Sequence, residues 1–501
     1  MSGVGLRSSV RRIVPLAWPV FVGQVAVLGF GTVDTVLVAR HSPTDLAALA
    51  VGGASYITVF VGLMGLVLGV SPIVGQLFGA KKLHEVGHQA WQALWLALAA
   101  AVLGSAVLVF PGPFLALSQA TPAVADKVRG YLMALAFALP ASLLFTVYRG
   151  FNVAVSRPKA VMALQVAGFV LKVPLSLALV KGVPALGLPA LGVVGCGIGT
   201  LIVMWAQVLV AWAVIRRDPF YRRFNLHGPG QWAPHWASLR ALLKLGVPMG
   251  LSILVEVSGF SMMAIFISRL GETAVAGHQI AVNLVSLLFM LPLGLSNATS
   301  TLVAQRIGAG DLPDARRLGW HGLQFTVALA LAVALLVFTV REQVLRLYTD
   351  NPAVIAAALP LLAWVVLFHT ADAAQTVSAF VLRAWQVTTA PMLIFVLALW
   401  GVGLGGGYAL AFNPHTVLPA DWQGARGFWI ASTCGLTLAA GLLGGLLARV
   451  LARVRARVLA QVLAQTRREA AEAAPAAGAI SLRAARADPA PTAATPGRPA
   501  A

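Results

Sequence analysis

Long apolar runs separated by short polar connections recur along the whole chain. Each run approaches or exceeds the roughly 20 residues that an α-helix needs to cross about 30 Å of hydrocarbon, and the connections are rich in charge, proline or glycine. The runs lie at residues 13–38, 46–70, 90–115, 129–149, 160–180, 191–215, 245–268, 274–302, 320–340, 354–382, 391–411 and 426–448. The pattern predicts an all-α membrane protein with twelve transmembrane helices.

Composition agrees with this prediction and limits the possible binding partners. Of the 501 residues 59% are hydrophobic and 10% are charged, and the mean hydropathy is +0.85, which lies outside the range of soluble globular proteins. The net charge of +20 would suit a nucleic-acid-binding protein, but the cations flank the predicted spans and form no recognition module. We therefore expect membrane lipids with anionic headgroups as partners, and no nucleic acid.

The distribution of basic residues predicts the orientation of the chain. If the N-terminus is cytoplasmic, 27 of the 36 Lys and Arg residues fall in cytoplasmic connections and termini, 8 fall in outer connections, and Lys172 lies inside a span. The positive-inside rule then places both termini in the cytoplasm.

An internal repeat divides the predicted spans into two sets of six. The basic segment 216–244 separates the sets, and a shift of 229 residues aligns 16–80 with 245–309 without a gap. The best local match pairs VGQLFGA (74–80) with VAQRIGA (303–309). Because six is an even number, both halves cross the membrane in the same orientation. This parallel repeat predicts a substrate cavity between the halves and alternating access by rocking.

The predicted domain organisation has four parts. They are an N-lobe of helices 1–6 (1–215), a cytoplasmic linker between the lobes (216–244), a C-lobe of helices 7–12 (245–448) and a cytoplasmic tail (449–501). Arginines alternate with valines at fourfold spacing over 448–474, which predicts an amphipathic helix lying on the headgroups. From Pro475 onward alanine and proline dominate, which predicts disorder.

Three acidic residues are placed where a charge is costly. Of the 16 Asp and Glu residues, only Asp34, Glu256 and Asp372 lie well inside predicted spans. An ionised group near the bilayer centre costs at least about 2.5–3.5 kcal/mol, so a functional role is the first interpretation for each, and a partner that fixes helix packing is the alternative. Glu256 lies roughly 17 Å into its span, and Asp372 lies at a similar depth.

Two carboxylates facing one dry cavity repel each other, and either a proton or a bound cation relieves the repulsion. Hard oxygen ligands suit sodium or a proton, so Glu256 and Asp372 are the predicted ion-coupling pair and a candidate Na+ site. A cationic substrate that competes for the same charge would make the protein an antiporter. The chain has no nucleotide-binding loop, zinc motif or nucleophile elbow. We expect no cofactor, no enzymatic activity and an ion gradient as the energy source.

Several stretches resemble one transporter family. They are VDTVLVAR, GVPMGLSILVEVS, VAGHQIAVNLVSLLFMLPLGLSNA, VAQRIGAGD and GARGFW. Together with the three acids they resemble the multidrug and toxic compound extrusion (MATE) transporters, in particular the bacterial NorM-like branch. The resemblance implies two pseudo-symmetric six-helix lobes in the inner membrane. It also implies export of cationic, amphipathic or hydrophobic drugs in exchange for Na+ or H+, by a protein that functions as a monomer.

The resemblance also implies roles for individual residues. Asp34 is the N-lobe acid, and Glu256 and Asp372 form the C-lobe cation site. Gln279, in the AGHQIA stretch, and Asp350, at the outer mouth of the tenth span, match positions that contact drugs. Four residues in all, Gln279, Asp350, Asn283 and Phe368, are candidates for substrate binding.

Two departures from the family pattern concern the ion sites. Where relatives have an asparagine-rich fifth span, this chain reads LKVPLS, with Lys172 and Ser176 in the asparagine places. We hypothesise that Lys172 faces Asp34 as a tethered cation and mutes ion binding in the N-lobe. Alternatively, Lys172 snorkels to an interface or stays neutral in an apolar pocket. Phe368 stands where a tyrosine is common, which removes one oxygen ligand for sodium.

Two other functions stay open from the sequence. A flippase for lipid-linked or polysaccharide precursors shares the wider architecture, but it would favour a strongly cationic cavity, which the three acids oppose. A membrane-embedded enzyme could use buried carboxylates on a lipid. It would need a convergent base, nucleophile or metal set, and none can be assembled from the sequence.

Overall fold

The computed structural model describes residues 5–118, 121–184, 187–226, 228, 230–412, 419 and 422–484, the last helix beyond residue 460 by its backbone alone. Within these residues twelve helices are long and apolar enough to cross a membrane. In chain order the crossing segments are α1 (Leu6–Ala39), α2 (Pro43–Leu68) with α3 (Val70–Gly79), α4 (Leu83–Val109), α6 (Pro122–Ala154), α7 (Pro158–Lys181), α8 (Val193–Arg217), α9 (Trp236–Ser268), α10 (Glu272–Gly308), α11 (Leu312–Thr339), α14 (Val365–Ala384), the run α15 (Thr389–Phe395), η3 (Val396–Gly405) and α16 (Gly406–Ala411), and α17 (Gly424–Ala484). The predicted number of spans is confirmed.

Short elements explain most differences from the predicted spans. They are α5 (Gly112–Ser118), η2 (Pro219–Phe224), α12 (Arg341–Tyr348) and α13 (Pro352–Leu362). The third span, predicted to reach residue 115, ends at Val109 because the Pro111-Gly112 pair breaks the helix and α5 starts anew. The tenth, predicted as one run over 354–382, is two helices that break between Leu362 and Val365, shortly after Pro360.

The predicted linker 216–244 is shorter than expected. Helix α8 continues to Arg217, and α9 begins at Trp236, just after Pro234, so residues 236–244 are helical. Proline restrains the residue before it to extended backbone, which sets the start of α9. In the remaining linker, the Phe220 N–H and the Arg157 guanidinium hold the pKa of Asp218 below its usual range. This contact ties the linker to the turn between α6 and α7.

The tail also differs from the prediction. Helix α17 runs without a break through 448–474 and past Pro475 as far as Ala484. The prediction of disorder from Pro475 is therefore wrong up to Ala484, because alanine is the strongest helix former and offsets one proline. Residues 485–501 lie outside the described part of the chain. The described residues from Arg449 onward form a unit of their own.

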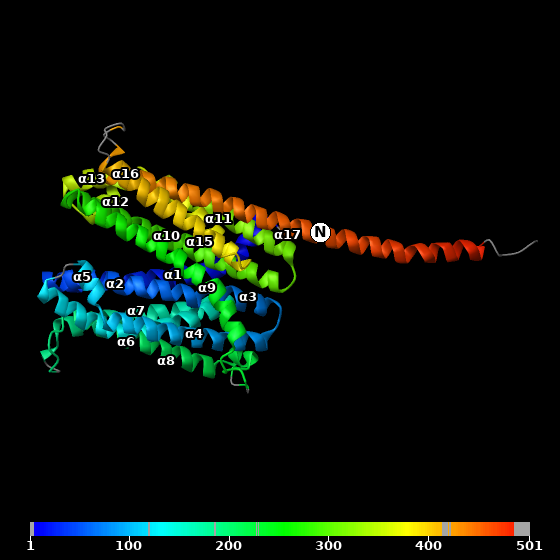
Figure 1. Cartoon of the computed structure of the whole chain (residues 1–501), viewed down its shortest axis with the longest axis horizontal. Helices are drawn as coiled ribbons and strands as arrows, with labels where there is room; N and C mark the ends of the chain where they lie inside the picture. Colours follow the sequence, from blue (N-terminus) through cyan, green and yellow to red (C-terminus); the bar gives the residue numbers. More distant parts are fainter. Residues whose placement is uncertain are drawn as a thin grey trace, which may run out of the picture. The chain divides into compact units, whose positions relative to one another are not determined.

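Residues Met1–Ala448 form the other unit, which contains two helix bundles (Figure 1). In the first, α6 packs against α2, α4 and α8, and α1 packs against α7. In the second, α10 packs against α11, α13 and α14, and α9 packs against α15 and η3. We call these the N-lobe (α1–α8) and the C-lobe (α9 to the part of α17 before residue 449). This is the predicted arrangement of two six-helix lobes.

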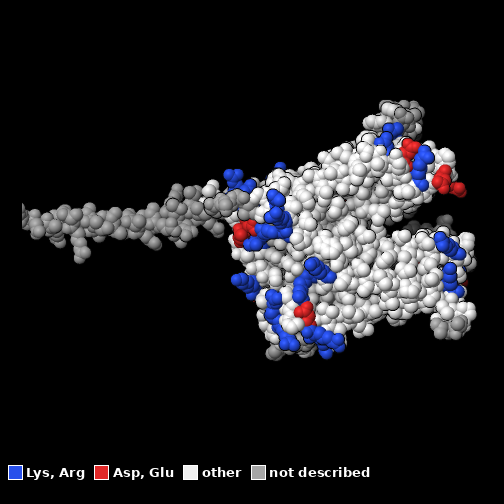
Figure 2. All heavy atoms as spheres, turned by 180° about the vertical axis from the view of Figure 1, so that it is seen from behind, with Lys and Arg blue, Asp and Glu red and all other residues white. Residues whose placement is uncertain are grey.

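The lobes touch at one end and separate at the other. Contacts between them join α1 with α10, α2 with α9, and α3 with α10. The helices approach so closely that a Cβ at Gly65 would lie 2.1 Å from the Cα of Gly250. An ion pair of 2.9 Å between Arg12 and Asp314 also crosses between the lobes. At the opposite end, which carries α5, α12 and α13, a notch opens between them (Figures 1 and 2).

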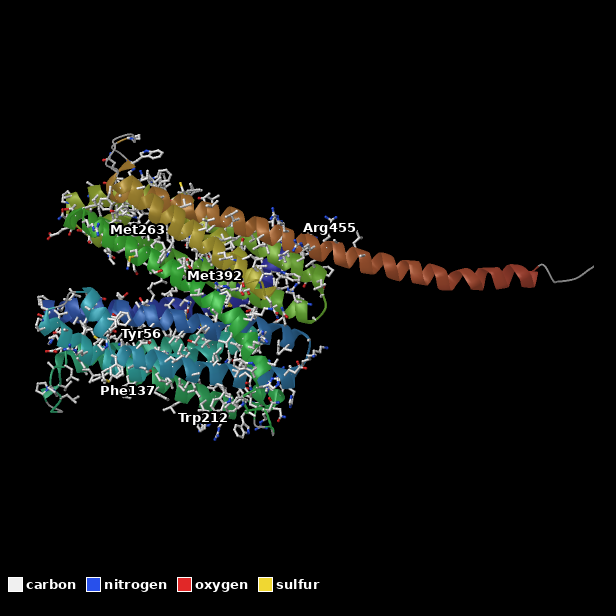
Figure 3. All side chains as sticks on the ribbon, viewed as in Figure 1. Tyr56, Phe137, Trp212, Met263, Met392 and Arg455 are labelled. Carbon is white, nitrogen blue, oxygen red and sulfur yellow. The ribbon has the colours of Figure 1, made fainter. Side chains whose placement is uncertain are left out.

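The outer face of the N-lobe is suited to lipid. Phe137 and Trp212 point away from this bundle (Figure 3), and their exposed fractions are 62% and 53%. The guanidinium of Arg216 lies over the Trp212 ring, 4.0 Å from its centroid. An indole beside an arginine at a helix end is typical of the membrane interface, so this end of α8 marks the depth at which the hydrocarbon stops.

Candidate ion-coupling and substrate sites

The N-lobe acid Asp34 lies within an ion pair. Asp34 is on α1 and Lys172 is on α7, and the Lys172 Nζ is 3.0 Å from the Asp34 Oδ1. The Ser176 hydroxyl, one turn further along α7, donates to the same oxygen at 3.4 Å. Lys172 is completely buried, so its amine points into the lobe rather than toward an interface.

Lys172 satisfies all three of its donors. Besides Asp34, its Nζ donates to the backbone oxygen of Cys196 at 2.9 Å and to the Thr200 hydroxyl at 2.7 Å, both on α8. Gly199 leaves room for the Ser176 hydroxyl, because a Cβ at residue 199 would lie 2.9 Å from the Ser176 Oγ. A buried ion pair is stable only when the remaining protons are hydrogen-bonded, and this pair meets that condition across three helices.

The C-lobe acids meet no such cation. Asp372, on α14, is 7% exposed, and its Oδ1 accepts a hydrogen bond of 2.9 Å from Gln375 Nε2. Glu256, on α9, lies close enough for its charge to act on Asp372, and it also neighbours Gln375 and Arg383. Among the ion pairs of the described residues, none involves Glu256 or Asp372. The two carboxylates therefore share a site with one amide and no salt-bridged base.

Aromatic rings lie one helical turn from each acid, toward the notch. Phe260 follows Glu256 by one helical turn, and Phe368 precedes Asp372 by one turn; their ring centroids are 6.2 Å apart. Phe368 also packs on Trp429 at 5.3 Å, and the Trp429 indole donates to His278 at 3.3 Å. Phe368 is only 2% exposed, so in this conformation it offers no surface to a substrate. Its ring packs in the hydrophobic core of the C-lobe, one turn from Asp372.

The other predicted substrate residues lie nearer the open end of the C-lobe. Gln279 and Asn283 are exposed and stand one turn apart on α10. The Tyr348 hydroxyl, at the end of α12, donates to the Asn283 Oδ1 at 3.0 Å, and the exposed Asp350 follows two residues later. Partial burial raises the pKa of Tyr348, which keeps this donor protonated. Tyr348 was not predicted from the sequence, because its interfacial helix carries no transmembrane signal.

The structure places two half-buried arginines further inside their helices than the predicted spans did, since Arg149 was the last residue of its predicted span and Arg383 lay just beyond its own. Helix α6 continues to Ala154 and α14 to Ala384, so Arg149 and Arg383 lie inside helices that cross the membrane. Arg149 donates to the Gln24 Oε1 at 3.2 Å, and it takes part in none of the described ion pairs. Pro158, which begins the next helix, is the sequence signal that could have located the end of α6.

Asp45 is a further acid that was predicted to lie in a connection and is buried. The helix α2 begins at Pro43, so Asp45 sits in its first turn, where Ser42 accepts from its N–H. The Asp45 Oδ2 is 2.7 Å from Lys127, and its Oδ1 accepts from the Val193 N–H at 3.1 Å. This acid joins α2, α6 and the start of α8, and its satisfied partners indicate a structural role.

The donor chemistry of the C-lobe site fits a light cation. Glu256, Asp372 and Gln375 offer only oxygen as ligand atoms. No group of three or more His, Cys, Asp and Glu side chains within the described residues could hold a metal ion. An oxygen-only set of this kind suits sodium or a proton and not a transition metal.

Comparison with known proteins identifies the family. Residues 19–178 and residues 248–409 each match the model of the same family, described as MatE. The chain belongs to the MatE family. The two matches begin 229 residues apart, which is the offset of the internal repeat, so the repeat and the resemblance to MATE transporters are both confirmed. MatE proteins are transporters, and the alternative of a membrane-embedded enzyme is excluded.

Relatives of this MatE chain match it over most of their length. A protein of Aromatoleum aromaticum named "Probable multidrug resistance protein NorM" is 42% identical over 429 residues, covering 86% of this chain and 92% of its own. A protein of the same name from Neisseria meningitidis serogroup B is 34% identical over 434 residues, with the same coverage. These relatives place the chain in the NorM-like branch.

Solved structures confirm the fold class. The crystal structure of the eukaryotic MATE transporter AtDTX14 superposes with a TM-score of 0.79 at 19% identity, covering 90% of this chain and 99% of the other. An outward-facing conformation of a multidrug resistance MATE family transporter gives a TM-score of 0.77 at 19% identity, covering 89% and 97%. The all-α, two-lobe architecture is shared even where little of the sequence is.

Removal of the Lys172 amine should destabilise the N-lobe. Lys172→Met leaves Asp34 buried without its cation, and breaking a buried ion pair costs about 3–5 kcal/mol. We expect a lower melting temperature in detergent, measured by tryptophan fluorescence. The double variant Asp34→Asn/Lys172→Met, which removes both charges, should recover most of the loss. Lys181→Met, at the exposed end of the same helix, is the control and should melt with the parent. Equal melting temperatures of Lys172→Met and the parent protein would contradict a stabilising ion pair.

Proposed function

We propose that this MatE protein is a secondary active multidrug efflux antiporter, which exports cationic amphipathic compounds in exchange for Na+ or H+ by alternating access. The observation that carries the proposal is the carboxylate pair of the C-lobe, the half-buried Glu256 and the buried Asp372, which takes part in no salt bridge among the described residues. It favours cation exchange over the flippase alternative, which would suit a cationic cavity.

The charge balance of the two lobes supports coupling through the C-lobe. Asp34 is already neutralised by the Lys172 amine, a cation that cannot dissociate from the chain. In the C-lobe the repulsion between Glu256 and Asp372 is reduced only by the Gln375 amide and the more distant charge of Arg383. A proton or a sodium ion entering there removes the repulsion, so its binding free energy is available to change the lobe's conformation.

Exchange follows if ion and drug favour different states of the same lobe. In this proposal the packed rings of Phe260, Phe368 and Trp429 act as a lid between the acid pair and the notch. An ion bound beneath it would stabilise the packed lid, and an amphipathic drug would be released when the lid packs. Gln279, Asn283 and Asp350, nearer the open end, supply polar contacts and one negative charge along the exit path. Relatives named as multidrug resistance proteins support a broad small-molecule substrate range.

We place the protein in the bacterial inner membrane with both termini in the cytoplasm. Basic residues gather at the end where the lobes touch (Figure 2), and this end includes the linker after α8 and the turns before α7 and α11. The positive-inside rule makes it the cytoplasmic end and orients the notch outward. Anionic headgroups would be the lipid partners of this face. A single chain contains both lobes, so the working unit is a monomer.

Neutralising the acid pair should abolish coupled transport. In everted membrane vesicles, with ethidium or norfloxacin supplied outside and Na+ and pH gradients imposed separately, Glu256→Gln and Asp372→Asn should each lower gradient-driven drug uptake at least about tenfold, because the ion loses its charge partner. Drug binding to the purified variants, measured by fluorescence, should persist.

The matched control for this test is Asp126→Asn. Asp126 is an acid at the exposed start of α6 with a surface partner, and transport should be unchanged in that variant. The gradient that drives wild-type transport identifies the coupling ion. If neither gradient moves any cationic compound in the wild-type protein, the export proposal is wrong.

Single cysteines test the orientation. In a chain whose Cys196 and Cys434 are replaced by alanine, Asp126→Cys should react with a membrane-impermeant maleimide added to intact cells, and Lys159→Cys should react only after the cells are opened. Both positions are exposed and they lie at opposite ends of the N-lobe. The reverse labelling pattern would place the notch on the cytoplasmic side.

A further inference from the structure

The best-preserved part of the internal repeat lies where the two lobes touch. The stretches 74–80 and 303–309 belong to α3 and to the end of α10, which pack on each other across the lobes. A Cβ on Gly79 would lie 1.9 Å from the backbone oxygen of Gln305, and a Cβ on Gly308 would lie 1.8 Å from that of Gln76. Each glycine therefore admits the backbone of the opposite lobe, and the two contacts are reciprocal.

Gln76, on α3 of the N-lobe, reaches the end of a C-lobe helix. Its Nε2 donates to the backbone oxygen of Ala384, the last residue of α14, at 2.8 Å. Its Oε1 accepts a hydrogen bond of 2.9 Å from the Gln386 side chain. One N-lobe glutamine thus contacts both the last carbonyl of α14 and the residue two positions later.

Gln305, the repeat equivalent of Gln76, makes the mirrored contacts. Its Nε2 donates to the backbone oxygen of Ala154, the last residue of α6, at 2.7 Å, and to the Ser156 hydroxyl at 2.8 Å. Ser156 and Gln386 both follow their helix by two residues, and both have left-handed backbone, with φ of 62° and 59°. In each lobe, therefore, a glutamine contacts the last carbonyl of a helix in the opposite lobe and the left-handed residue two positions after it.

The accepting carbonyls have a reason to bind a side chain. The last carbonyls of a helix have no intrahelical donor, and a buried one needs another partner. Ala154 would bond to the residue four positions later, which is Pro158 and has no N–H. The glutamine of the opposite lobe supplies the missing donor.

We propose that Gln76 and Gln305 form a pseudo-symmetric clasp that holds the lobes together at this end and sets the equilibrium between the two access states. The inference rests on alternating access and goes beyond the proposed substrate and coupling ion. Opening this end breaks both glutamine contacts together and exposes two helix-end carbonyls. The Arg12–Asp314 ion pair and a 2.8 Å hydrogen bond between Ser9 and His321 also join the lobes here, but the repeat equivalent of Arg12 is Ala241, so the ion pair acts from one side alone.

Spin labels at Lys159 and Arg316 measure the opening. Both positions are exposed, and they begin α7 in the N-lobe and α11 in the C-lobe, at the end where the lobes touch. In the full chain with Cys196 and Cys434 replaced by alanine, pulsed electron–electron distance measurements give the populations of short and long separations. Gln76→Ala and Gln305→Ala should each raise the long-distance population relative to the short one by about fivefold, the shift that corresponds to one net hydrogen bond. The double variant should raise it by about 25-fold if the two contacts are independent.

The control is Gln207→Ala. Gln207 is also a helix glutamine whose Nε2 donates to a backbone oxygen, that of Leu164 at 2.9 Å, but both residues belong to the N-lobe. Gln207→Ala should leave the distance distribution unchanged.

An independent experiment uses Gly79→Ala and Gly308→Ala, which add a Cβ without removing a polar group and should also open this end. Gly53→Ala, whose Cβ meets nothing within 4 Å, is their control.

Three outcomes would overturn the clasp: unchanged distances in the double glutamine variant, an effect of only one of the two glutamines, or an equal effect of Gln207→Ala. Each variant is first checked for a single peak in size-exclusion chromatography, and the glycine variants decide the matter if a glutamine variant fails this check. The distances are measured without drug or gradient. If the glutamine variants change the distances but the protein transports no compound, the proposed function is refuted and the clasp still stands.

Discussion

The cost of placing charge in hydrocarbon governs this structure. Every ionised group at membrane depth needs a partner of opposite charge, a set of hydrogen bonds, or an exchangeable ion. Asp34 and Lys172 compensate each other within one lobe, with α8 completing the lysine's hydrogen bonds. Among the described residues Glu256 and Asp372 take part in no ion pair, and Gln375 donates to Asp372. In the proposed antiport, this is the lobe in which an entering cation changes the charge balance.

This difference separates the two lobes despite their shared architecture. The repeat places Met263 of the C-lobe at the position of Asp34 in the N-lobe, so the charged interiors do not correspond. The ends where the lobes touch do correspond, down to the left-handed residues that follow α6 and α14. A hinge between two rigid bundles needs matched surfaces at the contact, whereas coupling needs only one asymmetric site. The structure therefore combines a symmetric contact with an asymmetric interior.

Prediction from the sequence succeeded for the number of spans and the two six-helix lobes. It failed at helix ends. The helical start of α9 at Trp236, the continuation of α6 and α14 around Arg149 and Arg383, and the burial of Asp45 were missed. Hydropathy locates the segment that must lie in hydrocarbon, but a helix ends where prolines, caps and tertiary contacts end it, often a turn or more beyond the apolar run. Buried charges near those ends were therefore assigned to connections.

The sequence by itself determined which residues enter the membrane and how deep each lies, because span length, hydropathy and rise per residue are properties of one segment at a time. Only the tertiary structure decided which charge meets which. Rotation of a helix about its axis is set by its neighbours, and no local pattern encodes it. The pairing of Asp34 with Lys172 and the bond from Gln76 to a carbonyl 308 residues away both depend on that rotation. So does the absence, within the described residues, of a salt bridge to Glu256 or Asp372.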